Sequence, residues 1–298
     1  MEYVLSLSYG KDSIACIEAI KQLDLPLDRI IHAELWATDT ISADLPSMVA
    51  FKKQADAIIK KRYGIKVEHI SYRKKGEKWT YEKQFYTTNS RKKRIYGFPL
   101  QRGIWCNSLK KSALNYAIKN TENAINYIGI AVDEEKRIER WSKKENFSLP
   151  LVEINWSEAD CFQWCKKNNL LSPIYQTSAR GGCWFCHNQS VAQLRNLRKN
   201  HPQLWEILLQ WDADSPTTFT IKHTIHDFEK RFALEEKGLI PMGNSFQWEM
   251  LQDKNVLCQI TLQELERTES KGGKKDEIYS NTLEYESAYE VCKTLHCF

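Results

Sequence analysis

The chain has 298 residues, and its 43 Lys and Arg against 38 Asp and Glu give a formal net charge of +5. Apolar residues make up 42% and charged residues 27%, a balance typical of globular proteins that excludes intrinsic disorder and collagen-like structure. No segment approaches the roughly 18 consecutive apolar residues of a membrane-spanning helix, and the first ten residues lack the pattern of a secretory signal. We therefore expect a cytoplasmic protein with no membrane partner.

Apolar periodicity predicts alternating strands and helices in the first half of the chain. The predicted strands are residues 3–7, 29–35, 67–71 and 124–130. One predicted helix begins near residue 14, and two more cover residues 47–63 and 110–120. This alternation is typical of an α/β fold with a parallel sheet. Farther on, Ser157 and Asp160 are spaced as a capping box that begins a helix, and the spacing from residue 190 onward is helical.

The loop Ser8–Ser13 joins the first predicted strand to the first helix. Such a junction presents backbone N–H groups to an anion. Gly10 permits close approach, Lys11 adds positive charge, Ser8 and Ser13 add hydroxyls, and Asp12 is placed to orient the loop or approach Mg²⁺. A Walker sequence is absent. The composition alone also fits an ordinary helix start.

Several segments resemble one known superfamily. SYGKDS at 8–13 resembles the SGGKDS loop of the PP-loop ATP pyrophosphatases, with Tyr9 in place of the first glycine. Four more segments are similar to the phosphoadenosine phosphosulfate reductase-like branch of that superfamily. They are ATDT at 37–40, WCNSLKK at 105–111, GIAVDEEKRIER at 129–140, and SPIY at 172–175 followed by GCWFC at 182–186.

The resemblance implies a Rossmann-like (adenine nucleotide alpha hydrolase-like) domain that cleaves ATP between its α and β phosphates with Mg²⁺. It implies a PP-loop domain at 1–170 and a cysteine-containing, mainly helical region at 171–298, in which residues 269–277 read as a polar linker. The implied nucleotide-binding residues are Ser8, Tyr9, Gly10, Lys11, Asp12, Ser13, Thr38, Asp39, Gly129 and Arg137. The implied catalytic residues are Lys11, Asp12, Asp133 and Glu134. The acid pair Asp133 and Glu134 also follows a predicted strand at the edge where parallel sheets bind ligands, although loop carboxylates are often merely solvated.

Cys183 and Cys186 form a C-x-x-C pair whose spacing suits one metal, and the resemblance adds Cys106. Three hypotheses remain open: a [4Fe-4S] cluster with one open iron for sulfide, a Zn²⁺ site, and a plain thiol or redox pair. The candidate fourth zinc ligands are His187, His201, His223 and Cys258. We expect the remaining cysteines to be buried or free thiols; they are Cys16, Cys161, Cys165, Cys258, Cys292 and Cys297.

Residues 73–102 mix Lys and Arg with aromatic side chains. Cations contact phosphates and aromatic rings stack on unpaired bases, so this segment suits tRNA or DNA as a partner. The alternatives are a basic insertion whose aromatics anchor it to the core, or a set of cations for nucleotide phosphates.

The leading hypothesis is an enzyme that adenylates a substrate and then transfers sulfur, supplied by a donor protein, to a nucleic acid. One alternative is a phosphoadenosine phosphosulfate or adenylylsulfate reductase with Cys292 or Cys297 as nucleophile. The other is a catalytically idle nucleotide-sensing partner of a multiprotein system, because Tyr9 and Ala131 depart from the superfamily pattern.

Overall fold

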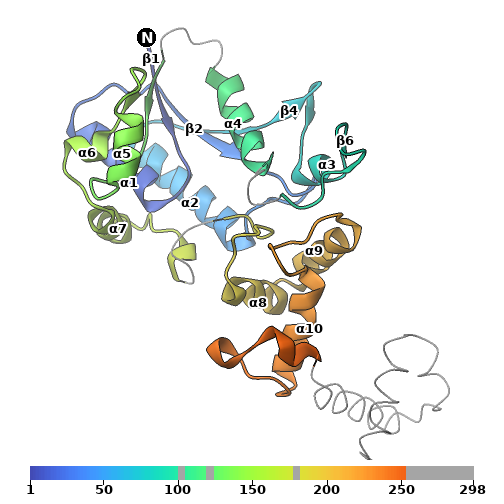
Figure 1. Cartoon of the computed structure of the whole chain (residues 1–298). Helices are drawn as coiled ribbons and strands as arrows, with labels where there is room; N and C mark the ends of the chain where they lie inside the picture. The colour runs from blue at the N-terminus through green and yellow to red at the C-terminus, as the bar shows by residue number, and fades with distance from the viewer. Residues whose placement is uncertain (100–104, 119–123, 177–181, 253–298) are drawn as a thin grey trace, which may run out of the picture. The chain divides into compact units, whose positions relative to one another are not determined.

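The computed structural model describes residues 1–99, 105–118, 124–176 and 182–252 (Figure 1). Contacts divide the chain into two compact units, Met1–Lys222 and His223–Phe298, and each is described by itself. The functional division expected at residue 170 stays a prediction. In the described residues, no helix is long and apolar enough to cross a membrane.

The first unit is built on a five-stranded sheet with the order β3-β2-β1-β8-β9, in which every pairing is parallel. The strands are β1 (Glu2–Ser6), β2 (Arg29–Glu34), β3 (Val67–Ser71), β8 (Ala124–Tyr127) and β9 (Phe147–Ser148). The predicted Rossmann-like α/β class is therefore confirmed. Strand β1 lies at the centre, and its Val4 and Leu5 are fully buried, as expected for a strand covered on both faces.

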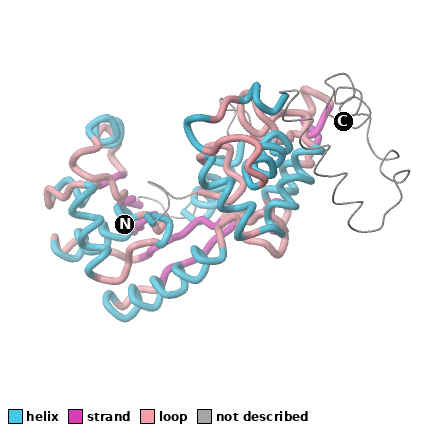
Figure 2. The backbone as a smooth tube through the Cα atoms, turned by 90° about the horizontal axis from the view of Figure 1, so that it is seen from below, coloured by secondary structure: helices cyan, strands magenta, loops and turns pink. Residues whose placement is uncertain are grey.

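Helices cover both faces of this sheet (Figure 1). Helices α1 (Lys11–Gln22) and α2 (Pro46–Tyr63) pack on one face, and α4 (Trp105–Ile118) lies on the other. Helix α1 turns Ile14, Ile17 and other apolar side chains of one face into the core, the 3.6-residue periodicity on which its prediction rested. Strands and helices alternate along this part of the backbone (Figure 2).

The strand order creates a switch point between β1 and β8. From β1 the chain runs outward through β2 to β3 and then returns to place β8 on the other side of β1. The connections that leave β1 and β8 diverge at the carboxyl ends of these strands, and open parallel sheets bind ligands in that crevice.

Three short helices follow β8: α5 (Glu135–Trp141), α6 (Pro150–Glu153) and α7 (Glu158–Lys167). The capping box predicted at Ser157 and Asp160 begins α7. Helix α7 packs on α1 and buries Cys161 and Cys165 completely. These two cysteines are core thiols, as expected.

The basic segment after β3 folds as two small hairpins around a short helix. They are β4 (Arg73–Lys74) with β5 (Glu77–Lys78), α3 (Tyr81–Phe85), and β6 (Thr88–Asn89) with β7 (Arg94–Ile95). The chain then reaches η1 (Pro173–Gln176), α8 (Val191–Asn200) and α9 (Pro202–Asp214), which confirm the predicted helical region. The ring of Trp211 on α9 packs against Tyr81, Phe85 and Trp184.

The second unit is described up to Gln252. It contains α10 (Ile225–Glu236) and the 3₁₀ turns η2 (Gly243–Ser245) and η3 (Trp248–Gln252). Leu234, Ile240 and Leu251 form its apolar core. The expected linker at 269–277 lies outside the described residues.

Candidate functional site

The loop Ser8–Ser13 connects β1 to α1, as predicted, and its two serines hold the loop together. The Oγ atoms of Ser8 and Ser13 lie 2.9 Å apart, Ser8 Oγ accepts from the N–H of Gly10 at 3.3 Å, and Ser13 Oγ accepts from the N–H of Ser8 at 3.2 Å. Both hydroxyls therefore shape the loop from within. Gly10 is extended with φ −75°, so it does not need a left-handed backbone.

Tyr9 has a positive φ of 57°, the left-handed conformation that glycine adopts without strain. Its side chain is buried, donates to Asp56 and approaches His69 Nε2 at 3.1 Å. This burial raises the pKa of Tyr9 far above its usual range. The side chain therefore anchors the loop from below, and only the backbone of Tyr9 remains for a ligand.

Two histidines in the network under Tyr9 have shifted pKa values. His69 faces Asp56 and Glu34, each at 2.8 Å, and these hydrogen bonds raise its pKa to about 9. Burial, with Lys52 beside it, lowers the pKa of His32 to about 3. His32, Glu34 and His69 lie close enough to hold a metal ion. However, the carboxylates occupy both ring nitrogens of His69, and the Lys52 ammonium is 2.7 Å from His32 Nε2, which is unfavourable for a cation.

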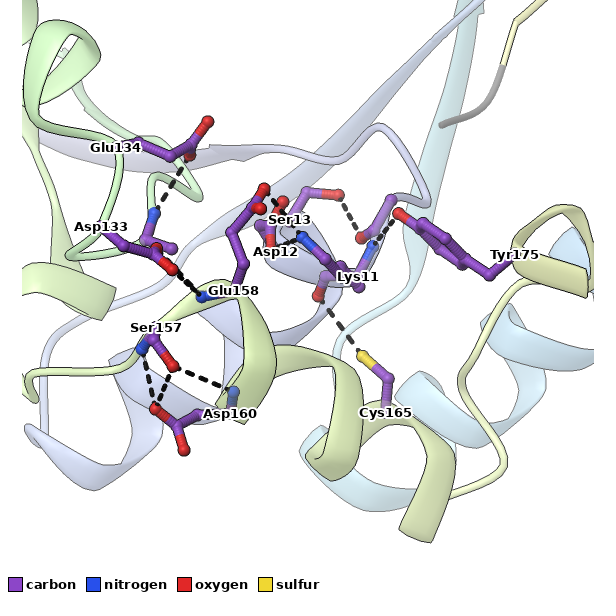
Figure 3. Close-up of polar contacts among 12 residues, drawn as sticks. Lys11, Asp12, Ser13, Asp133, Glu134, Ser157, Glu158, Asp160, Cys165 and Tyr175 are labelled. Atoms are coloured by element: carbon purple, nitrogen blue, oxygen red, sulfur yellow. Dashed lines mark hydrogen bonds and ion pairs between the residues drawn. The ribbon is translucent and has the colours of Figure 1, made fainter. Parts of the chain in front are cut away.

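Lys11 lies among three carboxylates at the start of α1 (Figure 3). Its ammonium donates to Asp12 at 2.7 Å and to Glu158 at 3.0 Å. One carboxylate oxygen from each of Asp12, Glu134 and Glu158 lies within 4.8 Å of the other two. We call the loop Ser8–Ser13 with Glu134 and Glu158 the loop site. Its three carboxylates are oxygen ligands of the kind that Mg²⁺ prefers, and the ammonium of Lys11 lies next to them.

The charges of the loop site depend on one another. Burial would lower the pKa of Lys11, but its hydrogen bonds to Asp12 and Glu158 outweigh that effect and raise the pKa. Burial raises the pKa of Asp12, and Glu158 and Glu134 add to the rise, although Lys11 opposes it. A cation bound by the three carboxylates would relieve this repulsion and release Lys11 toward a phosphate.

Gly129 brings the end of β8 against the loop. A Cβ atom on Gly129 would lie 2.6 Å from the carbonyl oxygen of Asp12 and 2.7 Å from the backbone nitrogen of Ser13. Only glycine allows this approach, because backbone atoms cannot move aside as a flexible side chain can. Gly129 therefore lies directly against the loop, and its implied role in nucleotide binding stays a prediction.

The acid pair after β8 divides its roles. The carboxylate of Asp133 accepts from the N–H of Glu158 at 3.0 and 3.2 Å, so it caps α7 and fixes Glu158 (Figure 3). Glu134 accepts from the N–H of Ala131 at 3.2 Å and pairs with Arg137. Asp133 therefore holds Glu158 in place in this structure, and its predicted catalytic role stays a prediction. Glu134 is part of the loop site, and Arg137 reaches it through Glu134.

Two residues that sequence reasoning missed touch the loop. Glu158 is the first residue of α7, and the capping box at Ser157 was the one signal that marked its place. The hydroxyl oxygen of Tyr175 accepts from the N–H of Lys11 at 3.0 Å (Figure 3). That oxygen occupies a helix N-terminal N–H, which is a position suited to a phosphate oxygen.

Thr38 and Asp39 form a turn after β2. Thr38 Oγ1 accepts from the N–H groups of Thr40 and Ile41 at 3.3 and 3.0 Å. The carboxylate of Asp39 accepts a hydrogen bond from Lys83 Nζ at 2.7 Å, and its backbone carbonyl accepts one from Lys78 Nζ at 2.5 Å. The predicted adenosine-binding turn is thus tied to the basic segment, and its role in binding stays a prediction.

The predicted metal ligands Cys106, Cys183 and Cys186 gather around Tyr81. Charge on each of the three thiols would raise the pKa of Tyr81, after the larger effect of burial. Burial and the Cys186 thiol raise the pKa of Cys106 to about 11, and burial raises that of Cys183 to about 12. We call these three cysteines with Tyr81 the cysteine site.

The cysteine site fits a thiolate-bound group by its chemistry. Soft thiolates select zinc and iron–sulfur clusters. Among the described residues, the hydroxyl of Tyr81 and the indole N–H of Trp105 are buried with no hydrogen-bond partner. The three sulfur atoms are not all within 4.8 Å of one another in the described chain, whereas tetrahedral zinc with 2.3 Å bonds needs them about 3.8 Å apart.

The candidate fourth ligands are scattered. Burial lowers the pKa of His187, and His201 separates α8 from α9. His223 belongs to the second unit, where its ring stacks 3.6 Å from that of Trp248. Cys258 lies outside the described residues.

The basic segment keeps its cations at the surface and buries half of its aromatics. Arg73, Lys74 and the run 91–94 are exposed. Tyr81, Phe85 and Phe98 are buried, and the rings of Tyr81 and Phe85 pack against Trp211 of α9. These three rings fit the anchoring role that was considered as an alternative to stacking on bases. Contact between the exposed cations of this segment and nucleic-acid phosphates stays a prediction.

No protein-family model matches the chain, and no curated protein matches it. Among solved structures, the chain is similar to the U34-tRNA thiolase NcsA from Methanococcus maripaludis with its [4Fe-4S] cluster, at 15% identity and a TM-score of 0.36 over 72% of each chain. So distant a similarity leaves the function to be argued from the two sites. Membership of the phosphoadenosine phosphosulfate reductase-like branch rests on the motifs alone.

Proposed function

We propose that this protein binds ATP with Mg²⁺ at the loop site and cleaves it between the α and β phosphates to adenylate an acceptor. One observation carries the proposal: Lys11 and three carboxylates meet where the end of β8, through Gly129, presses against the loop after β1. This is the switch point of the sheet, where the strand topology alone predicts a ligand.

The residues of the loop site divide the work. Lys11 and the N–H groups at the start of α1 would stabilise the charge that develops on the departing pyrophosphate, an electrostatic contribution from donors already in place. Asp12, Glu134 and Glu158 would hold the magnesium that accompanies ATP and neutralises its phosphates. Asp133 holds Glu158 in position, and Tyr9 anchors the loop through the Asp56 and His69 network.

The cysteine site supports sulfur transfer as the second half of the reaction. Cys106, Cys183 and Cys186 would hold a [4Fe-4S] cluster, which supplies an iron site for sulfide when it is bound; zinc is the alternative occupant of the same thiols. Sulfide-level sulfur, ultimately from a donor protein, would then attack the adenylated acceptor and displace AMP. The exposed cations of residues 73–94 favour a nucleic acid, tRNA or DNA, as that acceptor.

Pyrophosphate release from ATP tests the first half. We expect release in the presence of bulk tRNA or DNA, and a decrease of about 100-fold or more in Lys11→Ala. Glu158→Gln should be impaired as well, because it removes one carboxylate and one partner of Lys11. Lys53→Ala, an exposed lysine on α2, is the matched control and should keep wild-type activity.

Two outcomes would decide for the alternatives. Sulfite released from a sulfonucleotide, with no pyrophosphate from ATP, would favour the reductase hypothesis. Nucleotide binding that Lys11→Ala only weakens, without pyrophosphate release on any nucleic acid, would favour the catalytically idle partner.

A further inference from the structure

Tyr81 lies between the two chain segments that carry the three cysteines. Its ring centroid is 4.6 Å from that of Trp105, the residue before Cys106, and 4.1 Å from that of Phe185, which separates Cys183 from Cys186. The rings of Phe85 and Trp211 complete its surroundings at 6.2 and 5.1 Å. The wall of the cysteine site is therefore aromatic, and Tyr81 is at its centre.

The position of Tyr81 is fixed by backbone contacts. It is the first residue of α3, which Thr80 caps by accepting from the N–H of Lys83 at 3.2 Å. The N–H of Tyr81 donates to the carbonyl of Trp36 at 2.8 Å. Two hydrogen bonds attach the turn with the C-x-x-C pair to the segment after β2. The ring N–H of Trp184 donates to the carbonyl of Ser42 at 2.9 Å, and its backbone N–H donates to the carbonyl of Ala43 at 3.0 Å.

The hydroxyl of Tyr81 has no hydrogen-bond partner among the described residues, although the side chain is only 1% exposed. A phenylalanine would fill the same aromatic space without leaving a polar atom unpaired, and buried hydroxyls in proteins nearly always have a partner. The ring that carries this hydroxyl packs on Trp105 and Phe185, the chain neighbours of the three thiols. Thiolate and sulfide sulfur are acceptors that such a hydroxyl can serve.

We propose that the hydroxyl of Tyr81 donates a hydrogen bond to a sulfur atom of the group that Cys106, Cys183 and Cys186 hold, and so sets the electronic properties of that group. The proposal rests on the proposed function of the cysteine site. Tyr81 is a positioning and tuning residue in this role. A hydrogen bond to a cluster sulfur stabilises the more negative, reduced state and raises the reduction potential.

Tyr81→Phe tests the proposal, because it removes the hydroxyl and keeps the ring. The full chain would be loaded anaerobically with iron and sulfide, and the reduction potential of the cluster measured. We expect a more negative potential in Tyr81→Phe at an unchanged iron and sulfide content. Tyr86→Phe is the matched control: its hydroxyl, in the same segment, donates to Asp214 at 2.6 Å, and its loss should leave the potential unchanged.

A second measurement applies if the three cysteines bind a single metal ion instead of a cluster. Co²⁺ would be bound in place of zinc, and the sulfur-to-cobalt charge-transfer band should move to lower energy in Tyr81→Phe, because the thiolates lose a donor. Thermal unfolding of each variant checks that the fold is kept.

The outcomes separate the two proposals. Potentials and charge-transfer bands that are the same in wild type and Tyr81→Phe, at equal loading, would overturn the role of Tyr81 and leave the ligand set intact. A wild-type chain that binds neither the cluster nor Co²⁺ would overturn the ligand set, and the role of Tyr81 with it.

Discussion

The loop site and the cysteine site satisfy their polar groups in opposite ways. At the loop site, Lys11, Glu134 and Ser13 have partners within the protein. At the cysteine site, the Tyr81 hydroxyl and the Trp105 N–H lack one among the described residues. A site that binds and releases a substrate must be stable when empty, whereas a site built around a resident group can leave donors for that group. The difference favours a passing ligand at the loop site and a permanent one at the cysteine site.

Among the changes that test the loop site, Gly129→Ala should have the largest effect, a loss of stability. The added methyl group would meet the backbone of Asp12 and Ser13 at 2.6 to 2.7 Å, and we expect the free energy of unfolding to fall by about 3 kcal/mol. Chemical denaturation measures it. Gly10→Ala is the matched control, since its methyl would meet Ser8 and Tyr175 at ordinary distances of 3.4 and 3.5 Å. A Gly129→Ala protein as stable as Gly10→Ala would contradict the contact between β8 and the loop.

The histidines under Tyr9 should make stability depend on pH from two sides. The pKa of His69 is raised to about 9, so its contribution is complete below about 6.5 and is lost as the pH rises toward 9. The pKa of His32 is lowered to about 3, so its contribution is lost as the pH falls from about 6.5 toward 3. We expect greatest stability of this network near pH 6.5.

Unfolding curves recorded from pH 4 to pH 10 measure this dependence. His69→Gln should flatten the alkaline side and leave the acid side. An unchanged alkaline decrease in that variant would show that another group causes it.

Asp133→Ala should have a smaller effect on stability and a clear one on activity. It removes the cap of α7, which lowers the free energy of unfolding by about 1 kcal/mol, and it releases Glu158 from its position in the loop site. Ser157→Ala removes a cap of the same helix without touching the bond between Asp133 and Glu158. Equal losses of pyrophosphate release in both variants would assign the effect to α7 as a whole.

Tyr175→Phe should have the smallest effect. Because the hydroxyl of Tyr175 already occupies the N–H of Lys11, a phosphate must displace it, and its removal should tighten ATP binding about fivefold. Isothermal titration calorimetry measures the change. Weaker binding would instead mean that the hydroxyl itself contacts the nucleotide.

Local patterns in the sequence predicted much of the fold. Residue periodicity located four of the five strands of the sheet and missed the two-residue β9, and the spacing of Ser157 and Asp160 located the start of α7. Lys11 and Asp12 were singled out because their motif is local in sequence, and Glu134 through the resemblance of a second segment, residues 129–140. Glu158 and Tyr175 could not be found in this way, since they reach the loop through the packing of α7 and η1.

Several side chains have structural contacts that the sequence did not predict. Asp133, predicted to be catalytic, also accepts a hydrogen bond from the first residue of a helix 25 residues farther along the chain. Tyr81, Phe85 and Phe98 are core residues, which fits the anchoring role considered beside base stacking. Residue type predicted the chemistry that these side chains are capable of, whereas tertiary contacts decided which part of it they use.

The hydrogen bonds of Tyr9 cross-link the loop to two other elements, because Asp56 belongs to α2 and His69 to β3. A loop tied in this way should exchange its amide hydrogens together with the sheet, not as an independent surface turn. It would also lose little conformational entropy when a ligand binds. Tyr9, which departs from the glycine of the superfamily motif, thus gives this loop a rigidity that glycine could not.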